Sequence, residues 1–159
     1  MTLAIERIIS GGQTGVDRAA LDVALLLAIP CGGWCPRGRK AEDGLIADRY
    51  PLQETRSRDY RHRTKANVLA SDGTLILYTK RLMGGTALTL RCAKGAHRPY
   101  CLVDLNLPPS PSNTLIWINN HSIRVLNVAG PRESQAPGIY WQARRWLLQL
   151  FARDPSAVV

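Results

Sequence analysis

Apolar residues along this chain gather in short runs that are bounded by glycine, proline and polar residues. Runs of this length with such boundaries are typical of β-strands, and the most continuous of them are typical of buried strands. The pattern predicts five strands, at residues 5–9, 30–35, 73–78, 99–103 and 123–128.

Between these runs, apolar residues recur every three to four positions, which is the spacing of one face of an α-helix. The clearest case is the last, where residues 139–150 place a row of apolar side chains on one face and Pro155 ends the helix. Further helices are predicted at residues 16–27, 59–70, 87–93 and 113–121.

This alternation predicts an α/β fold in which helices cover both faces of a mainly parallel sheet of five or six strands. Right-handed crossovers on both sides of a central first strand predict the strand order 3-2-1-4-5. A length of 159 residues is typical of one domain, which we expect to span residues 1–159.

Four polar, glycine-containing loops follow predicted strands. They lie at residues 10–17, 36–44, 79–86 and 130–134. Ligands of parallel α/β sheets bind outside the carboxyl ends of the strands. Because several such loops leave one edge of the sheet, we expect a ligand-binding site there.

The first of these loops has the sequence SGGQTGVDR at residues 10–18 and joins a strand to a helix. Glycines allow close approach of a ligand, and the first turn of a helix favours an anion. The loop matches neither standard phosphate-binding fingerprint, so a plain tight turn remains the alternative. We expect an anion at the backbone of residues 11–15 and 84–86, and we expect Gly12→Val to abolish binding with little loss of stability.

The chain is basic, with a net charge of +9 and a sequence pI of about 10.0. Residues 37–65 hold nine lysines and arginines but only two aromatic residues, Tyr50 and Tyr60. This composition favours a basic rim for a small anionic ligand over a nucleic-acid groove, which needs a stacking platform. Arg37, Arg39 and Arg132 are the arginines expected to contact a phosphate, although a solvated face is the alternative for most of this charge.

Cysteine and histidine usage indicates no metal or redox centre. The four cysteines form no CxxC pair and the three histidines are scattered, so we expect reduced thiols, a cytoplasmic protein and no metal site built by side chains. Cys35 ends a predicted strand beside the basic loop, where it is either a reactive thiol or, more simply, a buried small hydrophobe. No run is long enough to cross a membrane, and residues 1–10 lack the apolar core of a signal peptide.

Carboxylates near the loops are the candidates for acid–base chemistry, and each has a structural alternative. Asp17 lies in a first helical turn, where acids are favoured by the helix dipole. Glu42 and Asp43 can balance Arg39 and Lys40, and Glu133 can cap the last turn-rich segment.

The sequence resembles the molybdenum carrier family. The motifs that carry the resemblance are SGGQTGVDRA at residues 10–19, LNVAGPRES at residues 126–134, and shorter matches at residues 32–36, 42–44, 50–55, 63–68 and 84–86. The resemblance implies a Rossmann-like three-layer fold that binds and stores molybdenum cofactor, a pterin phosphate bearing a dithiolene-bound metal. It also implies a homo-oligomer, a dimer or tetramer, with molybdenum enzymes as possible recipients of the cofactor.

The same fold family includes phosphoribohydrolases that cleave nucleoside monophosphates, with a loop resembling Pro-Gly-Gly-x-Gly-Thr-x-x-Glu. This chain has Thr89 in place of the glutamate, and a hydroxyl cannot serve as a carboxylate base. We therefore expect a carrier and no catalytic residue, with a hydrolase or a nucleotide- or ADP-ribose-sensing module as alternatives. The expected ligand- or phosphate-binding residues are Ser10, Gly11, Gly12, Gln13, Thr14, Gly15, Asp17, Arg18, Cys35, Arg37, Lys40, Gly84, Gly85, Thr86, Gly130, Arg132, Glu133 and Ser134.

Overall fold

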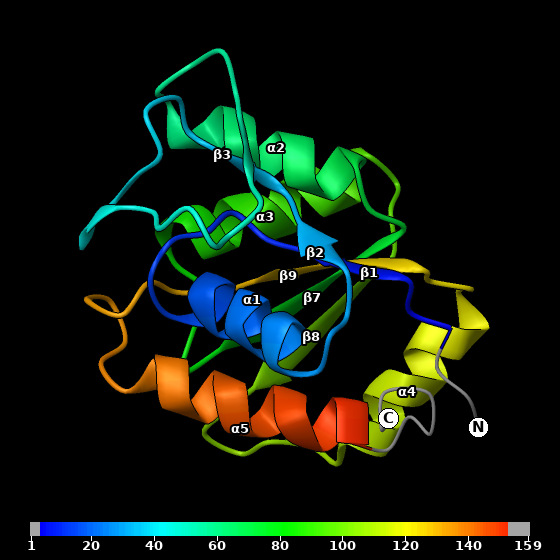
Figure 1. Cartoon of the computed structure of the whole chain (residues 1–159). Helices are drawn as coiled ribbons and strands as arrows, with labels where there is room; N and C mark the ends of the chain where they lie inside the picture. The colour runs from blue at the N-terminus through cyan, green and yellow to red at the C-terminus, as the bar shows by residue number, and fades with distance from the viewer. Residues whose placement is uncertain (1–3, 153–159) are drawn as a thin grey trace.

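A five-stranded parallel sheet forms the centre of the computed structural model, which describes residues 4–152 (Figure 1). Every pairing in it is parallel, and the strands lie in the order β2-β1-β9-β7-β8. The strands are β1 (Arg7–Ile9), β2 (Cys31–Gly32), β7 (Gly73–Tyr78), β8 (Tyr100–Asp104) and β9 (Val125–Ala129).

Helices cover both faces of this sheet, so the fold has the three-layer α/β architecture that the sequence predicts (Figure 1). Helices α2 (Tyr60–Leu69) and α3 (Gly84–Gly95) pack on one face. The other face carries α1 (Val16–Leu26), α4 (Pro111–Asn120) and α5 (Ile139–Ala152). The larger apolar core lies between these three helices and the sheet.

The predicted strand order is wrong, because the last strand lies between the first and the third. Strand β9 pairs with β1 through Ile8 and Leu126, and with β7 through Leu75 and Val128. If the five strands of this sheet are numbered by their order in the chain, their order across the sheet is 2-1-5-3-4. Strands β7 and β9 are both largely buried and mostly apolar, and this pattern does not reveal which strands are neighbours.

The predicted strand at residues 30–35 is split at Gly33. Strand β2 stays in the main sheet, while β3 (Trp34–Cys35) pairs in parallel with β6 (Gln53–Glu54). Gly33 has a φ of +130°, and a Cβ there would collide with the carbonyl oxygen of Ser10. A non-glycine residue could not make this turn without strain.

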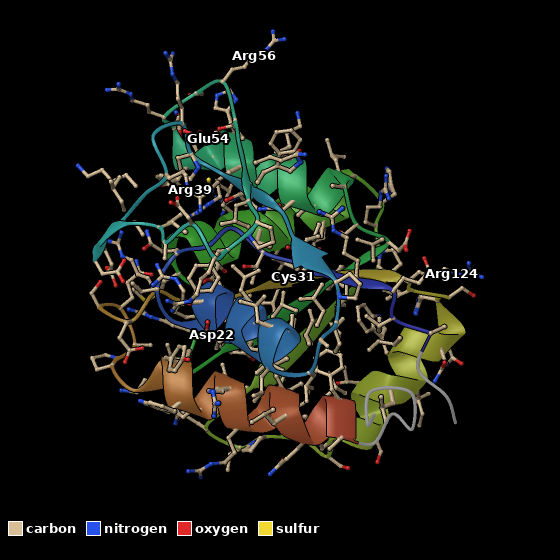
Figure 2. The ribbon with its side chains drawn as sticks, viewed as in Figure 1. Asp22, Cys31, Arg39, Glu54, Arg56 and Arg124 are labelled. Carbon is tan, nitrogen blue, oxygen red and sulfur yellow. The ribbon has the colours of Figure 1, made fainter. Side chains whose placement is uncertain are left out.

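The basic segment between β3 and β6 is ordered by its own contacts. It contains an antiparallel hairpin of β4 (Lys40–Ala41) and β5 (Gly44–Leu45). Arg39 lies inside the segment and donates hydrogen bonds to four backbone carbonyls, of Ile46, Ala47, Tyr50 and Leu52. Its guanidinium therefore holds the loop together, whereas Arg56 reaches outward from the surface (Figure 2).

Helix boundaries follow local sequence signals. Asp59 caps α2 by accepting the N–H of Arg61, in agreement with the predicted helix over residues 59–70. Helix α4 begins slightly earlier than predicted, with Ser110 as its cap and Pro111 in its first turn. The predicted stop at Pro155 lies outside the described residues. Within residues 4–152, no helix is long and apolar enough to cross a membrane.

Candidate functional site

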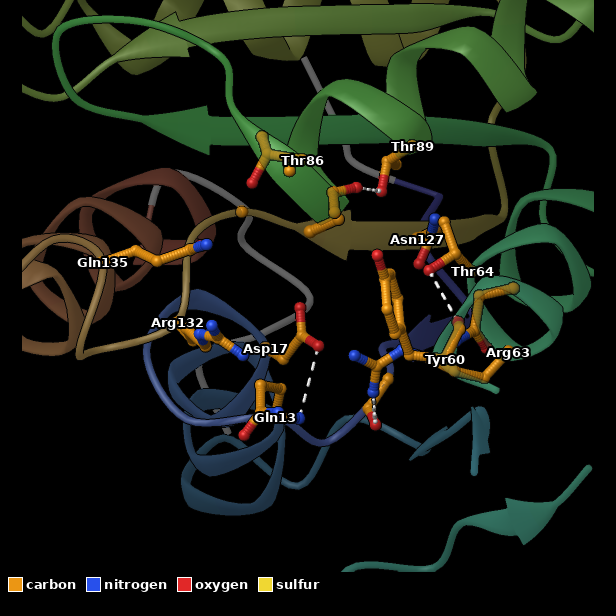
Figure 3. A pocket seen from close by; sticks show the side chains of 16 residues that line it. Gln13, Asp17, Tyr60, Arg63, Thr64, Thr86, Thr89, Asn127, Arg132 and Gln135 are labelled. Atoms are coloured by element: carbon orange, nitrogen blue, oxygen red, sulfur yellow. Dashed lines mark hydrogen bonds between the residues drawn. The ribbon is translucent and has the colours of Figure 1, made fainter. Parts of the chain in front are cut away.

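A cavity of about 230 Å³ lies at the carboxyl ends of the central strands (Figure 3). The loop after β1, the start of α3 after β7, and the end of β9 all contribute to it, and α2 closes one side. Its lining residues are Gly11, Gln13, Asp17, Tyr60, Arg63, Thr64, Asn67, Gly84, Gly85, Thr86, Thr89, Asn127, Ala129, Gly130, Arg132 and Gln135.

Three of the four loops that the sequence singles out meet at this cavity. They bring together eight of the expected binding residues: Gly11, Gln13, Asp17, Gly84, Gly85, Thr86, Gly130 and Arg132. The reason is topological, because the carboxyl ends of parallel strands share one edge of the sheet. The fourth loop, at residues 36–44, does not line the cavity.

The start of α3 is suited to an anion. N–H groups of a first helical turn lack intrahelical acceptors, and the helix dipole places partial positive charge there. No acidic residue lies in the first turn of α3, and its cap residue, Met83, makes no side-chain cap bond. The Thr86 side chain is buried, and its hydroxyl has no hydrogen-bond partner among residues 4–152. A ligand oxygen at this point would provide one.

Thr89 lies one turn further along α3 and also lines the cavity. Its hydroxyl donates a 2.9 Å hydrogen bond to the carbonyl oxygen of Gly85 (Figure 3). The position therefore presents a hydroxyl that is bonded within its own helix, with no carboxylate.

The first glycine loop is bonded within itself. The N–H of Gly12 donates to Ser10 Oγ, and the N–H of Gln13 donates to Asp17 Oδ2, each at 3.3 Å. The N–H of Thr14 donates to Gln13 Oε1 at 3.0 Å. Side-chain oxygens thus take the places that a bound anion would take, and the loop presents the Asp17 carboxylate to the cavity.

Asp17 is an unusual carboxylate because it is buried at the cavity wall, with 7% of its surface exposed. Burial raises its pKa from 3.8 to about 6, although Arg63, the N–H of Gln13 and Arg18 each oppose the rise. Arg63 donates a 2.9 Å hydrogen bond to the carbonyl of Gly11, so its charge is held above the loop. Asp17 is therefore close to half-protonated at mildly acidic pH.

Helix α2 supplies cavity residues that the sequence analysis did not select: Tyr60, Arg63, Thr64 and Asn67. Thr64 and Asn67 are buried although they are polar. Asn67 also exchanges two hydrogen bonds with the backbone of Trp34, which fixes α2 against β3. The signals in the sequence were the motif match at residues 63–68 and the polar residues at spacings of three to four along this helix. Asn127 and Gln135 were also missed.

Five expected residues lie on the opposite side of the first loop, in a shallow depression: Thr14, Gly15, Arg18, Glu133 and Ser134. Glu42 organises this region by accepting hydrogen bonds from Thr14, from Ser134 Oγ at 2.5 Å and from the Ser134 N–H at 3.1 Å. Burial opposes its ionisation, but these bonds and the Arg132 charge outweigh that effect and lower its pKa.

The other candidate acids also have structural partners. Asp43 forms an ion pair with Arg18, at 2.9 Å, and this bond lowers its pKa. Glu133 accepts the N–H groups of Gly138 and Tyr140 at the start of α5. The structural alternative considered for Glu133 thus describes its contacts, whereas Asp43 pairs with Arg18 and not with the neighbouring Arg39 or Lys40. Among the described acids, Asp17 alone lines the cavity.

The remaining expected residues lie away from the cavity. Ser10 and Cys35 are fully buried, and burial raises the pKa of the Cys35 thiol. A side chain at Gly12 would point toward Leu52, away from the cavity, while Arg37 and Lys40 are exposed on the fourth loop. The described cysteines are free, and no group of three or more metal-ligating side chains is found across residues 4–152.

Comparisons with known proteins support the fold and identify a family. The model of the circularly permutated YpsA SLOG family matches residues 8–151. A crystal structure from Syntrophus aciditrophicus SB, described as a "Putative molybdenum carrier protein", is 47% identical in sequence and has a TM-score of 0.90. The match covers 94% of this chain and 97% of that one. Among curated proteins, none matches the chain.

Proposed function

Because the chain belongs to the circularly permutated YpsA SLOG family, we propose that it is a binding protein that stores and carries molybdenum cofactor. The observation that carries the proposal is the buried, unpartnered hydroxyl of Thr86 at the start of α3, inside the cavity. The similar protein from Syntrophus, described as a "Putative molybdenum carrier protein", supports the choice of ligand.

The phosphate of the cofactor is proposed to bind at the start of α3. The N–H groups of Gly84 and Gly85 and the Thr86 hydroxyl would donate to its oxygens. Arg132 lines the same cavity and would add a charge-assisted bond. Gly11 would let the ligand lie close to the backbone, because a Cβ there would lie among the Arg63 and Asp17 side chains. Gly130 is instead required by packing, since a Cβ there would collide with the carbonyl oxygen of Leu77 and with Val16. The internally bonded first loop would form the opposite wall.

Storage without reaction is supported by the same residues. At the position where the phosphoribohydrolases of the same fold family carry a glutamate, this chain has Thr89, whose hydroxyl donates to the carbonyl oxygen of Gly85. Loss of a general acid or base typically lowers a rate by about 10² to 10⁴. The expected recipients are molybdenum enzymes of the cytoplasm, and we propose that the chain forms a dimer or tetramer.

One observation favours a second candidate function, a phosphoribohydrolase acting on nucleoside 5′-monophosphates. Asp17 faces the cavity with its pKa raised to about 6, which is suitable for a general acid or base near neutral pH. The nucleotide- or ADP-ribose-sensing alternative would use the same phosphate position.

The carrier proposal is tested on protein purified from a host that makes molybdenum cofactor. Native mass spectrometry should find retained molybdopterin, and incubation with a cofactor-free molybdenum enzyme should restore that enzyme's activity. Thr86→Val should retain much less cofactor, whereas Thr114→Val, a buried threonine outside the cavity, should retain as much as wild type.

The same preparation is incubated with AMP, and release of free base is followed. We expect wild type to release free base no faster than Thr86→Val does. Hydrolysis at about one per second or faster, without cofactor retention or transfer, would replace the carrier proposal with the hydrolase.

A further inference from the structure

We propose that Asp17 determines the ligand class of this cavity: the ligand is a phosphomonoester that also carries neutral hydrogen-bond donors, and the Asp17 carboxylate accepts those donors. The inference rests on the proposed function for the position of the phosphate at α3. It adds a second contact, at the other end of the ligand, which decides between phosphorylated compounds.

The two walls of the cavity have opposite hydrogen-bonding character. The start of α3 offers N–H groups and the unpartnered hydroxyl of Thr86. The first glycine loop offers an acceptor, the Asp17 carboxylate, and the N–H groups of Gly12, Gln13 and Thr14 already donate to side-chain oxygens of the loop. Figure 3 shows the Asp17 carboxylate between Arg132 on one side and Tyr60 and Arg63 on the other.

The charges around Asp17 keep it available as an acceptor at neutral pH. Arg18 on its own helix and Arg63 on α2 both favour its ionised form. The loop after β9 contributes Arg132, and the cavity residues of α3 and β9 are uncharged. An ionised carboxylate accepts hydrogen bonds and cannot donate them, so it selects hydroxyl or N–H groups on the ligand.

This arrangement disfavours a diphosphate that spans both glycine loops. A second phosphate at the first loop would face the Asp17 carboxylate and find the N–H groups of Gly12, Gln13 and Thr14 already bonded. Like charges at such close range oppose each other strongly. Sugar hydroxyls and the ring N–H groups of a pterin both supply the required donors, so either kind of phosphomonoester fits.

The test measures a ratio of affinities by isothermal titration calorimetry. Ribose 5-phosphate carries hydroxyl donors, methyl phosphate carries the same phosphoester without them, and inorganic pyrophosphate represents the polyanion. In the wild-type protein we expect ribose 5-phosphate to bind at least about 10-fold more tightly than methyl phosphate, the effect of a hydrogen bond to a charged group. Pyrophosphate should bind less tightly than ribose 5-phosphate.

Three variants separate the contributions. Asp17→Asn should remove most of the preference for ribose 5-phosphate, leave methyl phosphate within about 3-fold, and improve pyrophosphate binding. Thr86→Val should weaken all three ligands alike. Asp48→Asn removes one negative charge at an exposed site outside the cavity and should leave the ratio unchanged.

A measurement on the wild-type protein does not depend on the folding of any variant. Lowering the pH from 8 to 5 takes Asp17 through its pKa of about 6, so the ratio of the two phosphoester affinities should fall toward one. The phosphate group titrates at nearly the same pH in both ligands, so its titration affects both affinities alike and cancels in their ratio.

The outcomes distinguish the two proposals. If Thr86→Val weakens no ligand, the phosphate position in the proposed function is overturned. If Thr86→Val weakens all ligands but the ratio is insensitive to both Asp17→Asn and pH, the phosphate position stands and the role of Asp17 is overturned.

Discussion

Among single residues, Asp17 is the clearest case of a side chain whose burial lowers the free energy of unfolding. It is buried, and its folded-state pKa of about 6 lies well above the ordinary 3.8. Such a shift corresponds to about 3 kcal/mol, so the ionised carboxylate lowers the free energy of unfolding at neutral pH by roughly that amount. Between pH 4 and 6 the folded state binds the proton more tightly, so this contribution to stability improves as the pH falls.

We therefore expect Asp17→Asn to be more stable than wild type at pH 7.5, by up to about 3 kcal/mol, with the difference vanishing near pH 4. Urea unfolding followed by circular dichroism at both pH values measures this. Asp48→Asn, on the surface, serves as the control and should show little difference at either pH. A variant that is less stable at pH 7.5 would show that the burial of Asp17 is not unfavourable.

Gly12 is a structural glycine, contrary to the expectation that Gly12→Val leaves stability nearly unchanged. Its φ is +78°, and a Cβ would collide with Leu52 in the small apolar cluster beneath the loop. Backbone strain and overpacking should together lower the free energy of unfolding by about 2 to 5 kcal/mol. Gly85→Ala is the matched control, because nothing lies within 4 Å of its Cβ. Thermal denaturation of both variants checks this, and equal midpoints would contradict it.

At the scale of elements, Glu42 joins three segments that are distant in the chain. It binds Thr14 in the first loop and Ser134 before α5, and its own N–H donates to Gln13. The β4–β5 hairpin is thereby attached to the loops whose far side forms the cavity.

Replacing Glu42 with Ala should loosen the hairpin without unfolding the sheet. We expect the free energy of unfolding to fall by about 1 to 2 kcal/mol, because two polar partners lose a charged acceptor at a partly exposed site. Hydrogen exchange followed by mass spectrometry should show faster exchange at residues 36–45 and 131–134 and no change in β7. Because the Glu42 pKa is lowered, its contribution is present at neutral pH and is lost in acid. Unchanged exchange in the hairpin would refute this role.

Across the whole molecule, much of the positive charge has internal partners. Arg39 holds the fourth loop, Arg61 pairs with Asp59, and Arg63 binds the Gly11 carbonyl. Of the three arginines expected to contact phosphate, Arg132 is the one that lines the cavity. The net charge of +9 therefore acts on an anionic ligand mainly as a long-range field.

Two effects on ligand affinity should follow from this distribution. Arg132→Ala should weaken ribose 5-phosphate about 5- to 20-fold through loss of a direct bond, whereas Arg37→Ala should weaken it less than about 2-fold. Raising sodium chloride from 50 to 500 mM should weaken binding to wild type and both variants, because exposed charges are screened. Calorimetric titrations at both salt concentrations measure these changes. Equal losses for both variants would support a diffuse basic rim over a specific arginine.

The sequence by itself determined the local elements and the set of loops that could form a site. Helix spacing, the cap at Asp59 and the buried strand at Gly73–Tyr78 depend on neighbouring residues, so they can be predicted from the sequence. Parallel topology then placed three glycine loops at one edge of the sheet. Eight of the expected residues line the cavity for that reason.

Only the tertiary structure decided which strands are neighbours and which polar groups are already bonded. The central place of β9 depends on a pairing between strands more than one hundred residues apart, for which no local pattern exists. The polar face of α2 lines the cavity only because the helix packs beside the loops, and that packing cannot be read from the helix sequence. Arginines and glycine-loop N–H groups look alike in a sequence whether they face a ligand or a carbonyl, because hydrogen-bond partners are set by the fold. That is why the sequence presented the first loop as an anion site, while the folded chain fills it with Asp17.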